Sequence, residues 1–484
     1  MRLQKWFFYF NHNQYKMKLF KTFTLTLVLI SLSFASFSQQ NPSGVITPSV
    51  LGKIKQSVKD EPSTRALINS INNSDVQQLA LNRENEGLLD KYFSNRINTK
   101  GITDQKSSGR CWLYTGLNVI RIQVISRYDM EGFELSQTYP FFWDQLEKAN
   151  LFLEGIIATA TQPLDEKRVD WLLKNPIGDG GQWTGVVDVV GKYGLVPAEI
   201  MPDSKNSENT RWLSRILTTN LRSNALELRK LAAEGKKLTE LETVKIEMLG
   251  EVYRVLVLML GEPPAEFSWR YKKTNGTVTE LTKYTPMSFY KDFVQVDLSQ
   301  YVMLMNDPSR EFSRLYEIDY DRHIYEGGNW KYINLPAEKI KEYAKASILD
   351  NQPMYFSCDV GKQLNKEEGT LDVNNYNFQD LFGVSLAMSK AERIQTFESG
   401  SSHGMNLVGV DLDKGGNPVK WLLENSWGAN SGFQGFLIMT DKWFDEYMFR
   451  LVVNKKYVPA DVLKILDTQP ILLPPWDPMF LPEE

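Results

Sequence analysis

The chain has 484 residues, of which 42% are hydrophobic and 24% are charged, a composition typical of a soluble globular protein with one large domain or two. Its 55 basic and 59 acidic residues give a net charge of −4, so the chain lacks the strong basic excess of many nucleic-acid-binding proteins. The two cysteines cannot build a disulfide framework, and stability must therefore come from a hydrophobic core.

The first 38 residues differ from the rest. They hold five basic residues and no acidic one, and an apolar run from about Thr22 to Ala35 precedes small residues that end at Ser38. This pattern is typical of a secretory signal peptide, so we expect residues 1–38 to be removed and the protein to be exported to the periplasm or the medium. Met17 is an alternative start, and an uncleaved N-terminal anchor is the alternative to cleavage.

Removal of this segment leads to two further expectations. The apolar run is short for a membrane span and no cysteine lies near the cleavage point to carry a lipid, so we expect no stable membrane anchor. The remaining chain has 50 basic and 59 acidic residues, a net charge of −9, which disfavours nucleic acid as a partner.

The elements predicted first along the chain are helices. Residues 39–90 are polar and predict an irregular or helical lead-in segment. From Cys111 to Ile125 apolar residues recur at helical spacing, which places the cysteine at a helix N-terminus. Helical patterns then fill about 209–261, where a glycine and two prolines end them.

The elements predicted later are strands. Three β runs near 407–410, 419–423 and 435–439 are separated by glycine and aspartate turns, so helices followed by an antiparallel sheet predict an α+β fold. The last residues, 466–484, are rich in proline and can form neither a helix nor a central strand. We expect them to be an extended arm.

Three short motifs suggest the chemistry. Cys111 follows Gln105 in Gln-Lys-Ser-Ser-Gly-Arg-Cys-Trp, His403 lies in Ser-Ser-His-Gly-Met, and Asn425 lies in Glu-Asn-Ser-Trp-Gly. A thiol at a helix N-terminus beside an imidazole is activated as a thiolate nucleophile. The order nucleophile, base, orienting residue predicts a cysteine hydrolase.

Each of these residues has a distinct predicted role. His403 takes the thiol proton and later protonates the leaving amine, while Asn425 holds the imidazole in the productive tautomer. Gln105 and the backbone N–H of Cys111 donate to the tetrahedral oxyanion. Trp427 shields the contact between Asn425 and His403 from water.

The other candidates for these roles are weaker. Cys358 and His323 lack supporting motifs, so we interpret both as structural residues. Caspase-like enzymes place the histidine before the cysteine, and arylamine acetyltransferases and transglutaminases would need aspartate at position 425. Zinc is disfavoured because Cys111 and His403 have no closely spaced ligand partner, and we expect no metal and no cofactor.

The motifs resemble the papain superfamily and, within it, the bleomycin hydrolase and aminopeptidase C family. Arg110 precedes the cysteine as in that branch, and Ser108 stands where ordinary papains carry a disulfide cysteine. Similar stretches run from about residue 90 to the end of the chain: 139–144, 179–183, 192–197, 358–362, 382–386, 424–428 and 475–479.

The resemblance implies the domain organisation. It implies a papain-like catalytic domain at 91–465 with a helix-rich insertion at about 205–345, and an arm at 466–484 that enters the active-site cleft. Gly180 and Gly181 are implied to line that cleft and to let a substrate backbone approach closely.

The resemblance also implies a six-subunit ring in which the arm fills the cleft upstream of the scissile bond. The terminal carboxylate at Glu484 then meets the substrate's ammonium group, and Trp427 belongs to the substrate-binding wall. Two departures concern the register of cleavage: Asp104 replaces a common asparagine, and the arm ends in two glutamates.

The chain is therefore interpreted as an exported cysteine aminopeptidase that acts on peptides with a free N-terminus. An endopeptidase whose arm leaves the cleft open is the first alternative. A non-catalytic ring-forming scaffold or binding protein is the second, which an intact catalytic set disfavours.

Overall fold

The structure is a computed structural model that describes residues 44–480 and divides into two compact units, Met1–Leu79 and Ala80–Glu484. The expected signal peptide and Glu484 lie outside the described residues. The first two helices of the first unit each begin with proline, whose missing backbone N–H is harmless at the first position of a helix. None of the side chains of these two helices is buried. The helices near this end are α2 (Pro48–Lys55), α3 (Pro62–Asn73) and α4 (Val76–Ala80).

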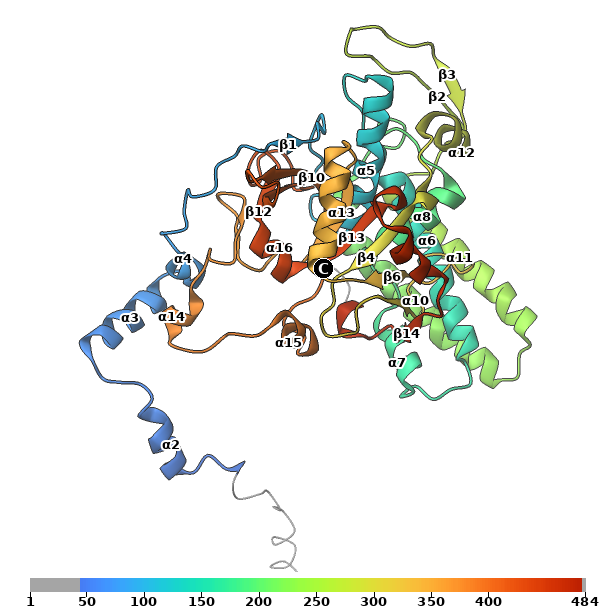
Figure 1. The fold of residues 1–484 in the computed structure, drawn as a ribbon. Coiled ribbons are helices and arrows are strands. Elements are labelled where there is room, and N and C mark those ends of the chain that lie inside the picture. The colour runs from blue at the N-terminus through green and yellow to red at the C-terminus, as the bar shows by residue number, and fades with distance from the viewer. Residues whose placement is uncertain (1–43, 481–484) are drawn as a thin grey trace, which may run out of the picture. The chain divides into compact units, whose positions relative to one another are not determined.

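The second unit begins with a helical half. Its central helix α5 (Cys111–Tyr128) is apolar on nearly all sides and is buried along most of its length, as a helix between two layers must be. Two long helices, α10 and α11, pack against each other and against α6 (Figure 1). The helices after α5 are α6 (Thr138–Ala158), α7 (Lys167–Lys174), α8 (Trp183–Tyr193), α9 (Lys205–Glu208), α10 (Arg211–Ala233) and α11 (Leu238–Leu260).

The insertion expected at about 205–345 is helical in its first part and mixes strands with short helical segments in its second part. Helix α11 ends at Gly261, whose φ of 93° suits a residue without a side chain, and the next prolines cannot continue a helix. Strands are the main regular elements between Gly261 and Pro336, because the apolar runs there are short and rich in aromatic residues. The elements after α11 are β2 (Phe267–Trp269), β3 (Thr282–Tyr284), α12 (Pro286–Ser288), β4 (Tyr301–Met305), β5 (Arg314–Ile318), β6 (Lys331–Asn334) and α13 (Ala337–Leu349).

A 12-stranded, mainly antiparallel sheet forms the other half, in the order β14-β5-β6-β4-β13-β7-β10-β11-β12-β9-β8, with β1 also paired to β10. A hydrophobic core packs between this sheet and the helices α13 and α16. The remaining elements are β1 (Asn95–Arg96), β7 (Met354–Cys358), β8 (Leu364–Asn365), β9 (Thr370–Leu371), α14 (Phe378–Phe382), α15 (Lys390–Gln395), β10 (His403–Leu412), β11 (Pro418–Glu424), β12 (Phe436–Thr440), α16 (Asp441–Tyr447), β13 (Met448–Asn454), α17 (Ala460–Leu463) and β14 (Ile471–Leu473).

Helix α5 lies directly against the sheet. A side chain at Gly404, the second residue of β10, would come within 3.2 Å of the Thr115 hydroxyl, one turn after the start of α5. Close packing therefore brings the start of the helix beside the start of β10. The three predicted β runs fall in β10, β11 and β12, and the predicted α+β arrangement is confirmed.

The C-terminal arm is extended, as its prolines predict. Strand β14 pairs in parallel with β5 at the edge of the sheet, and Asp319 N–H donates to the Leu473 carbonyl at 2.8 Å. A short 3-10 turn at Pro478–Phe480 ends the described part of the arm. Proline is tolerated here because an edge strand needs only one row of backbone hydrogen bonds.

Candidate active site

Cys111 is the first residue of α5, as the sequence predicts. Its side chain is only 3% exposed and forms no disulfide. The free backbone N–H groups of a helix N-terminus stabilise an anion, so this position favours a thiolate. Cys358, the other cysteine, lies in the apolar core of the sheet half and pairs in register with His403 on the neighbouring strand.

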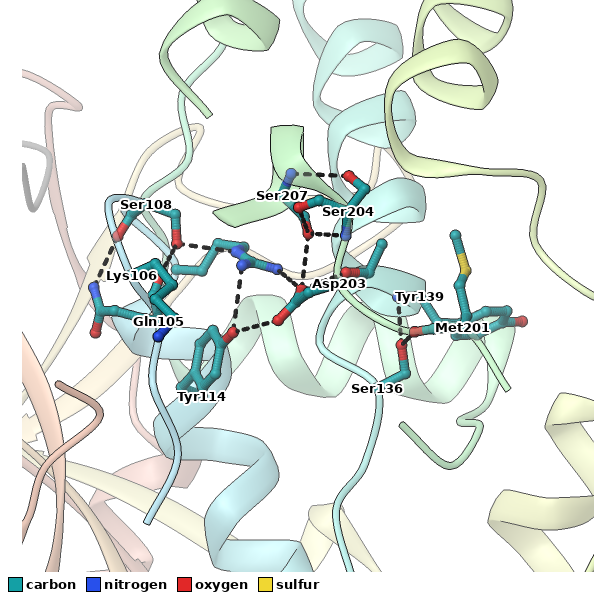
Figure 2. A network of polar contacts seen from close by, with 12 residues as sticks. Gln105, Lys106, Ser108, Tyr114, Ser136, Tyr139, Met201, Asp203, Ser204 and Ser207 are labelled. Carbon is teal, nitrogen blue, oxygen red and sulfur yellow. Dashed lines mark hydrogen bonds and ion pairs between the residues drawn. The ribbon is translucent and has the colours of Figure 1, made fainter. Parts of the chain in front are cut away.

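An ion pair between a buried arginine and a partly exposed aspartate fixes the turn that leads into Cys111. Arg110 is fully buried, donates to the Ser108 hydroxyl at 3.0 Å, and meets Asp203 at 3.1 Å. Asp203 also accepts hydrogen bonds from Tyr114 and Ser207 (Figure 2). Burial alone would raise the pKa of Asp203, but Arg110 and the hydroxyl donors outweigh it and hold that pKa below its usual value. The carboxylate stays charged and keeps the turn in place.

Asp179 holds the nucleophile segment from the opposite side. Its side chain accepts from the Gly109 N–H at 3.2 Å and from the Ser214 hydroxyl at 2.7 Å. Its backbone carbonyl accepts from the Trp112 indole N–H at 2.8 Å. One residue thus contacts the positions on both sides of the dipeptide Arg110-Cys111.

His403, Asn425 and Trp427 form the second half of the site. His403 begins β10, and its Nε2 donates to the Asn425 Oδ1 at 2.8 Å. This hydrogen bond leaves Nδ1 as the proton acceptor of the ring. The Trp427 indole stacks on the imidazole with the ring centres 4.8 Å apart.

Burial dominates the ionisation of the base. It lowers the pKa of His403 from 6.5 to about 4, although the hydrogen bond to Asn425 partly opposes this shift. A neutral imidazole is ready to accept the thiol proton, and a thiolate beside it would add to the stabilisation that Asn425 gives the charged ring.

Gln105 is tied to the same loop as Asn425. Its backbone N–H donates to the Ser426 carbonyl at 2.8 Å, and the Ser426 hydroxyl donates to its Oε1 at 2.6 Å. Its Nε2 donates to the Ser108 carbonyl at 2.8 Å. Because an amide nitrogen carries two protons, the second N–H remains for an oxyanion.

A buried ion pair also ties α5 to β11. Arg121 meets Glu424, the residue before Asn425, at 2.6 Å, and both side chains are almost fully buried. Burial raises the pKa of Glu424 to about 7, although Arg121 and Asn406 oppose this shift. The helix that carries the nucleophile is thus joined to the strand that carries the orienting residue.

Gly180 and Gly181 line a cavity of about 290 Å³ together with Pro475 of the arm. A side chain at Gly181 would come within 2.7 Å of the Trp112 ring, so only glycine fits beside the nucleophile helix. Lys148 supports this wall by donating to the Gly178 and Gly180 carbonyls at 3.1 and 2.6 Å.

The structure places Gln105, Cys111, His403, Asn425 and Trp427 around the packed starts of α5 and β10. The predicted role of Glu484 stays a prediction, because that residue is outside the described part. Between residues 44 and 480, no group of three His, Cys, Asp or Glu residues could hold a metal ion, and no helix could span a membrane.

Some supporting residues were missed from the sequence. Asp179 and Ser426 lie inside motifs quoted above. The signal that could have identified them is a short polar residue next to glycine or asparagine. His323 packs edge-on against Trp112, and its Nδ1 lies 2.5 Å from Asp144. No local pattern marks this distant contact, although its interpretation as a structural residue agrees with the geometry.

A cysteine at a helix N-terminus, a buried histidine–asparagine pair and a glutamine that bonds to both the nucleophile turn and the loop of the asparagine define a papain-like cysteine peptidase. Known proteins agree with this class. The sequence matches the Peptidase C1-like family over residues 45–480.

Individual relatives match most of the chain. Aminopeptidase C of Lactobacillus delbrueckii subsp. lactis is 40% identical over 398 residues, covering 81% of this chain and 88% of that protein. Bleomycin hydrolase of Rattus norvegicus is 40% identical over 389 residues, covering 78% and 86%. The crystal structure of PepW from Lactobacillus rhamnosis HN001 matches with a TM-score of 0.87 at 35% identity, covering 91% of this chain and 100% of that one.

The chain belongs to the Peptidase C1-like family. Within that family it is a cysteine-type aminopeptidase, in agreement with the relatives it matches over most of their length.

Proposed function

We propose that the protein removes residues from the free N-terminus of peptides by thiolate attack. The Cys111 sulfur adds to the carbonyl carbon of the scissile amide, and Gln105 and the Cys111 N–H bind the oxyanion. The intermediate collapses with cleavage of the C–N bond, and His403 gives its proton to the leaving amine. Water then hydrolyses the thioester, with His403 as the base, and restores the thiol.

The position of the arm carries the proposal for a free N-terminus. The Pro478 carbonyl lies 3.8 Å from where a side chain at Gly400 would begin, three residues before His403. Met479 is only 1% exposed, and Pro475 shares its cavity with Gly180 and Gly181. An arm held here leaves room for few substrate residues before the scissile bond, and a terminal carboxylate beyond it would attract an ammonium group.

The test compares two peptides that differ only at the N-terminus. The full chain should cleave a free-amine dipeptide amide and reject its N-acetylated twin, whereas a chain lacking Phe480–Glu484 should accept both. Alkylation of Cys111 by iodoacetamide should proceed equally in the two proteins. Cleavage of the acetylated peptide by the full chain would favour the endopeptidase, and no cleavage of either peptide would favour the scaffold.

We further propose export and assembly into a six-subunit ring. Export is supported by the sequence of residues 1–38, and the ring by the resemblance to the bleomycin hydrolase and aminopeptidase C family. The intact mass of chain recovered outside the cytoplasm should correspond to cleavage after about Ser38. Light scattering on that material should give six times the mass of one chain.

A further inference from the structure

Arg310 connects the catalytic body of the protein to the arm. It lies in the loop after β4, and its guanidinium meets Asp307 of the same loop at 2.5 Å and Asp477 of the arm. The Arg310 side chain is 19% exposed, while those of Asp307 and Asp477 are 0% and 7% exposed. A partly buried cation between two buried carboxylates is a geometrically demanding contact that a fork-shaped guanidinium suits.

Asp307 gives this contact a rigid base. Its carboxylate accepts from the Ser309 N–H at 2.9 Å, and its own N–H donates to the Asn334 side chain at 2.9 Å. The Asn334 amide in turn donates to the Asp307 carbonyl at 2.9 Å. Asn334 ends β6, so Asp307 is fixed to the sheet and Arg310 is fixed to Asp307.

Asp477 passes this constraint to the arm. Its N–H donates to the Pro474 carbonyl at 3.1 Å and closes a turn. One carboxylate oxygen meets Arg310, and the other accepts from the Met479 N–H at 3.2 Å. The direction in which the chain leaves Met479 is therefore set by a carboxylate that Arg310 holds in place.

Two other contacts of the arm lie nearer its root than Asp477. The backbone of β14 pairs with β5, and Lys167 lies over the Trp476 ring at 4.4 Å from its centre. These contacts would keep the arm attached without Arg310, but they precede the turn at Asp477. Beyond this turn the Met479 carbonyl also accepts a hydrogen bond from Arg450 at 3.5 Å, so Arg310 and Arg450 both act on the part of the arm that follows β14.

We infer that Arg310 is a positioning residue that sets the register of substrate binding. Acting through Asp477, it fixes where the arm ends relative to the segment from Gly400 to His403. It thereby determines how many substrate residues fit before the scissile bond. This inference rests on the proposed function, because it assumes that the arm selects the free N-terminus.

The experiment measures the ratio of kcat/KM for the free-amine dipeptide to that for its N-acetylated twin. Arg310→Met should lower this ratio at least about tenfold, because a buried carboxylate that has lost its cation moves toward water. Arg310→Lys should give a smaller loss, since an ammonium cannot bridge both carboxylates in the same plane. The rate of Cys111 alkylation should not change in either variant.

Two further variants make the result specific. Arg314→Met removes an exposed arginine that pairs with Glu311, so its ratio should equal that of the unmodified chain. Asp477→Asn leaves the contact between Arg310 and Asp307 intact and should lower the ratio as Arg310→Met does. The double variant should be no worse than either single one, because both remove the same contact.

Failure of the inference can be told apart from failure of the proposed function. If the full chain cleaves both peptides equally, the arm does not select the N-terminus. If the full chain discriminates and the folded Arg310→Met chain discriminates equally, the positioning role is wrong. Should Arg310→Met fail to fold, an unchanged ratio in Asp477→Asn contradicts the inference by itself.

Discussion

The two halves of the active site are held in different ways. The nucleophile segment is surrounded by polar contacts, from Arg110 and Asp203 on one side and Asp179 on the other. The base has one hydrogen bond, to Asn425, and is otherwise enclosed by the Trp427 ring and the sheet. The first half is therefore positioned by charge and hydrogen bonding, and the second half by burial.

This difference assigns separate tasks to the two halves. Polar contacts from two sides hold the segment that carries the thiol at a fixed place. Burial controls the proton affinity of His403, since a low-dielectric environment penalises the imidazolium. Substitutions in the first half should therefore change the rate of the chemical step, and those in the second half should also change the response to pH.

Loss of the nucleophile should have the largest effect. Cys111→Ala should abolish hydrolysis of the free-amine dipeptide and labelling by iodoacetamide, because no other group in the site can form the thioester. Cys358→Ala keeps a small apolar residue in the sheet core and serves as the control, with rate and labelling close to those of the unmodified chain. A folded Cys358→Ala protein without activity would mean that the thiol has been misassigned.

Loss of the oxyanion donor Gln105 should lower the activity less than loss of Cys111 does. Gln105→Ala should lower kcat by about 10²–10³, or about 2.7–4 kcal/mol, with little change in KM, because the lost N–H acts mainly in the transition state. Gln123→Ala removes a half-buried glutamine of helix α5 that bonds only to Val119 and Tyr301. Equal losses in the two variants would show that Gln105 acts through stability.

The change of the unfolding free energy at acidic pH should reveal that His403 is buried. Unfolded His403 takes up a proton near pH 6.5 and the folded residue near pH 4, so the unfolded state binds more protons between these values. The unfolding free energy should therefore fall as the pH falls through this window, by at most about 3 kcal/mol from this residue.

The measurement uses the inactive Cys111→Ala chain with and without His403→Gln, followed by urea unfolding at pH 7.5 and at pH 4. His403→Gln removes the titration, so its stability relative to the parent should rise as the solution becomes acidic. If the unfolding free energies of the two chains differ by the same amount at both pH values, the folded imidazole titrates normally.

Much of the site could be predicted because its parts are coded locally. The helix after Cys111 follows from apolar spacing, and the roles of His403 and Asn425 follow from the chemistry of a few candidate residues. Helical spacing predicts helices only to about residue 261, and the helix-rich insertion at about 205–345 is what the resemblance implies, so neither source predicts the strands between residues 267 and 334. Those strands are short, and two of them, β4 and β5, pair with the distant strands β13 and β14.

The contacts that support the site could not be read from the sequence for a similar reason. Asp203 follows Arg110 by 93 positions, and Asp477 follows Arg310 by 167. Nothing local distinguishes these carboxylates from the many on the surface. The sequence indicates which residues react, whereas the folded chain shows which residues hold them.

The pairing of β14 with β5 has a consequence for how the arm can vary. A strand of three residues followed by two prolines offers little to a further strand, so it closes an edge of the sheet that would otherwise invite aggregation. The backbone makes these hydrogen bonds, and few changes of side chain remove them. If the arm selects substrates as proposed, the residues after Met479 can change with new substrates while the pairing of β14 keeps this edge of the sheet covered.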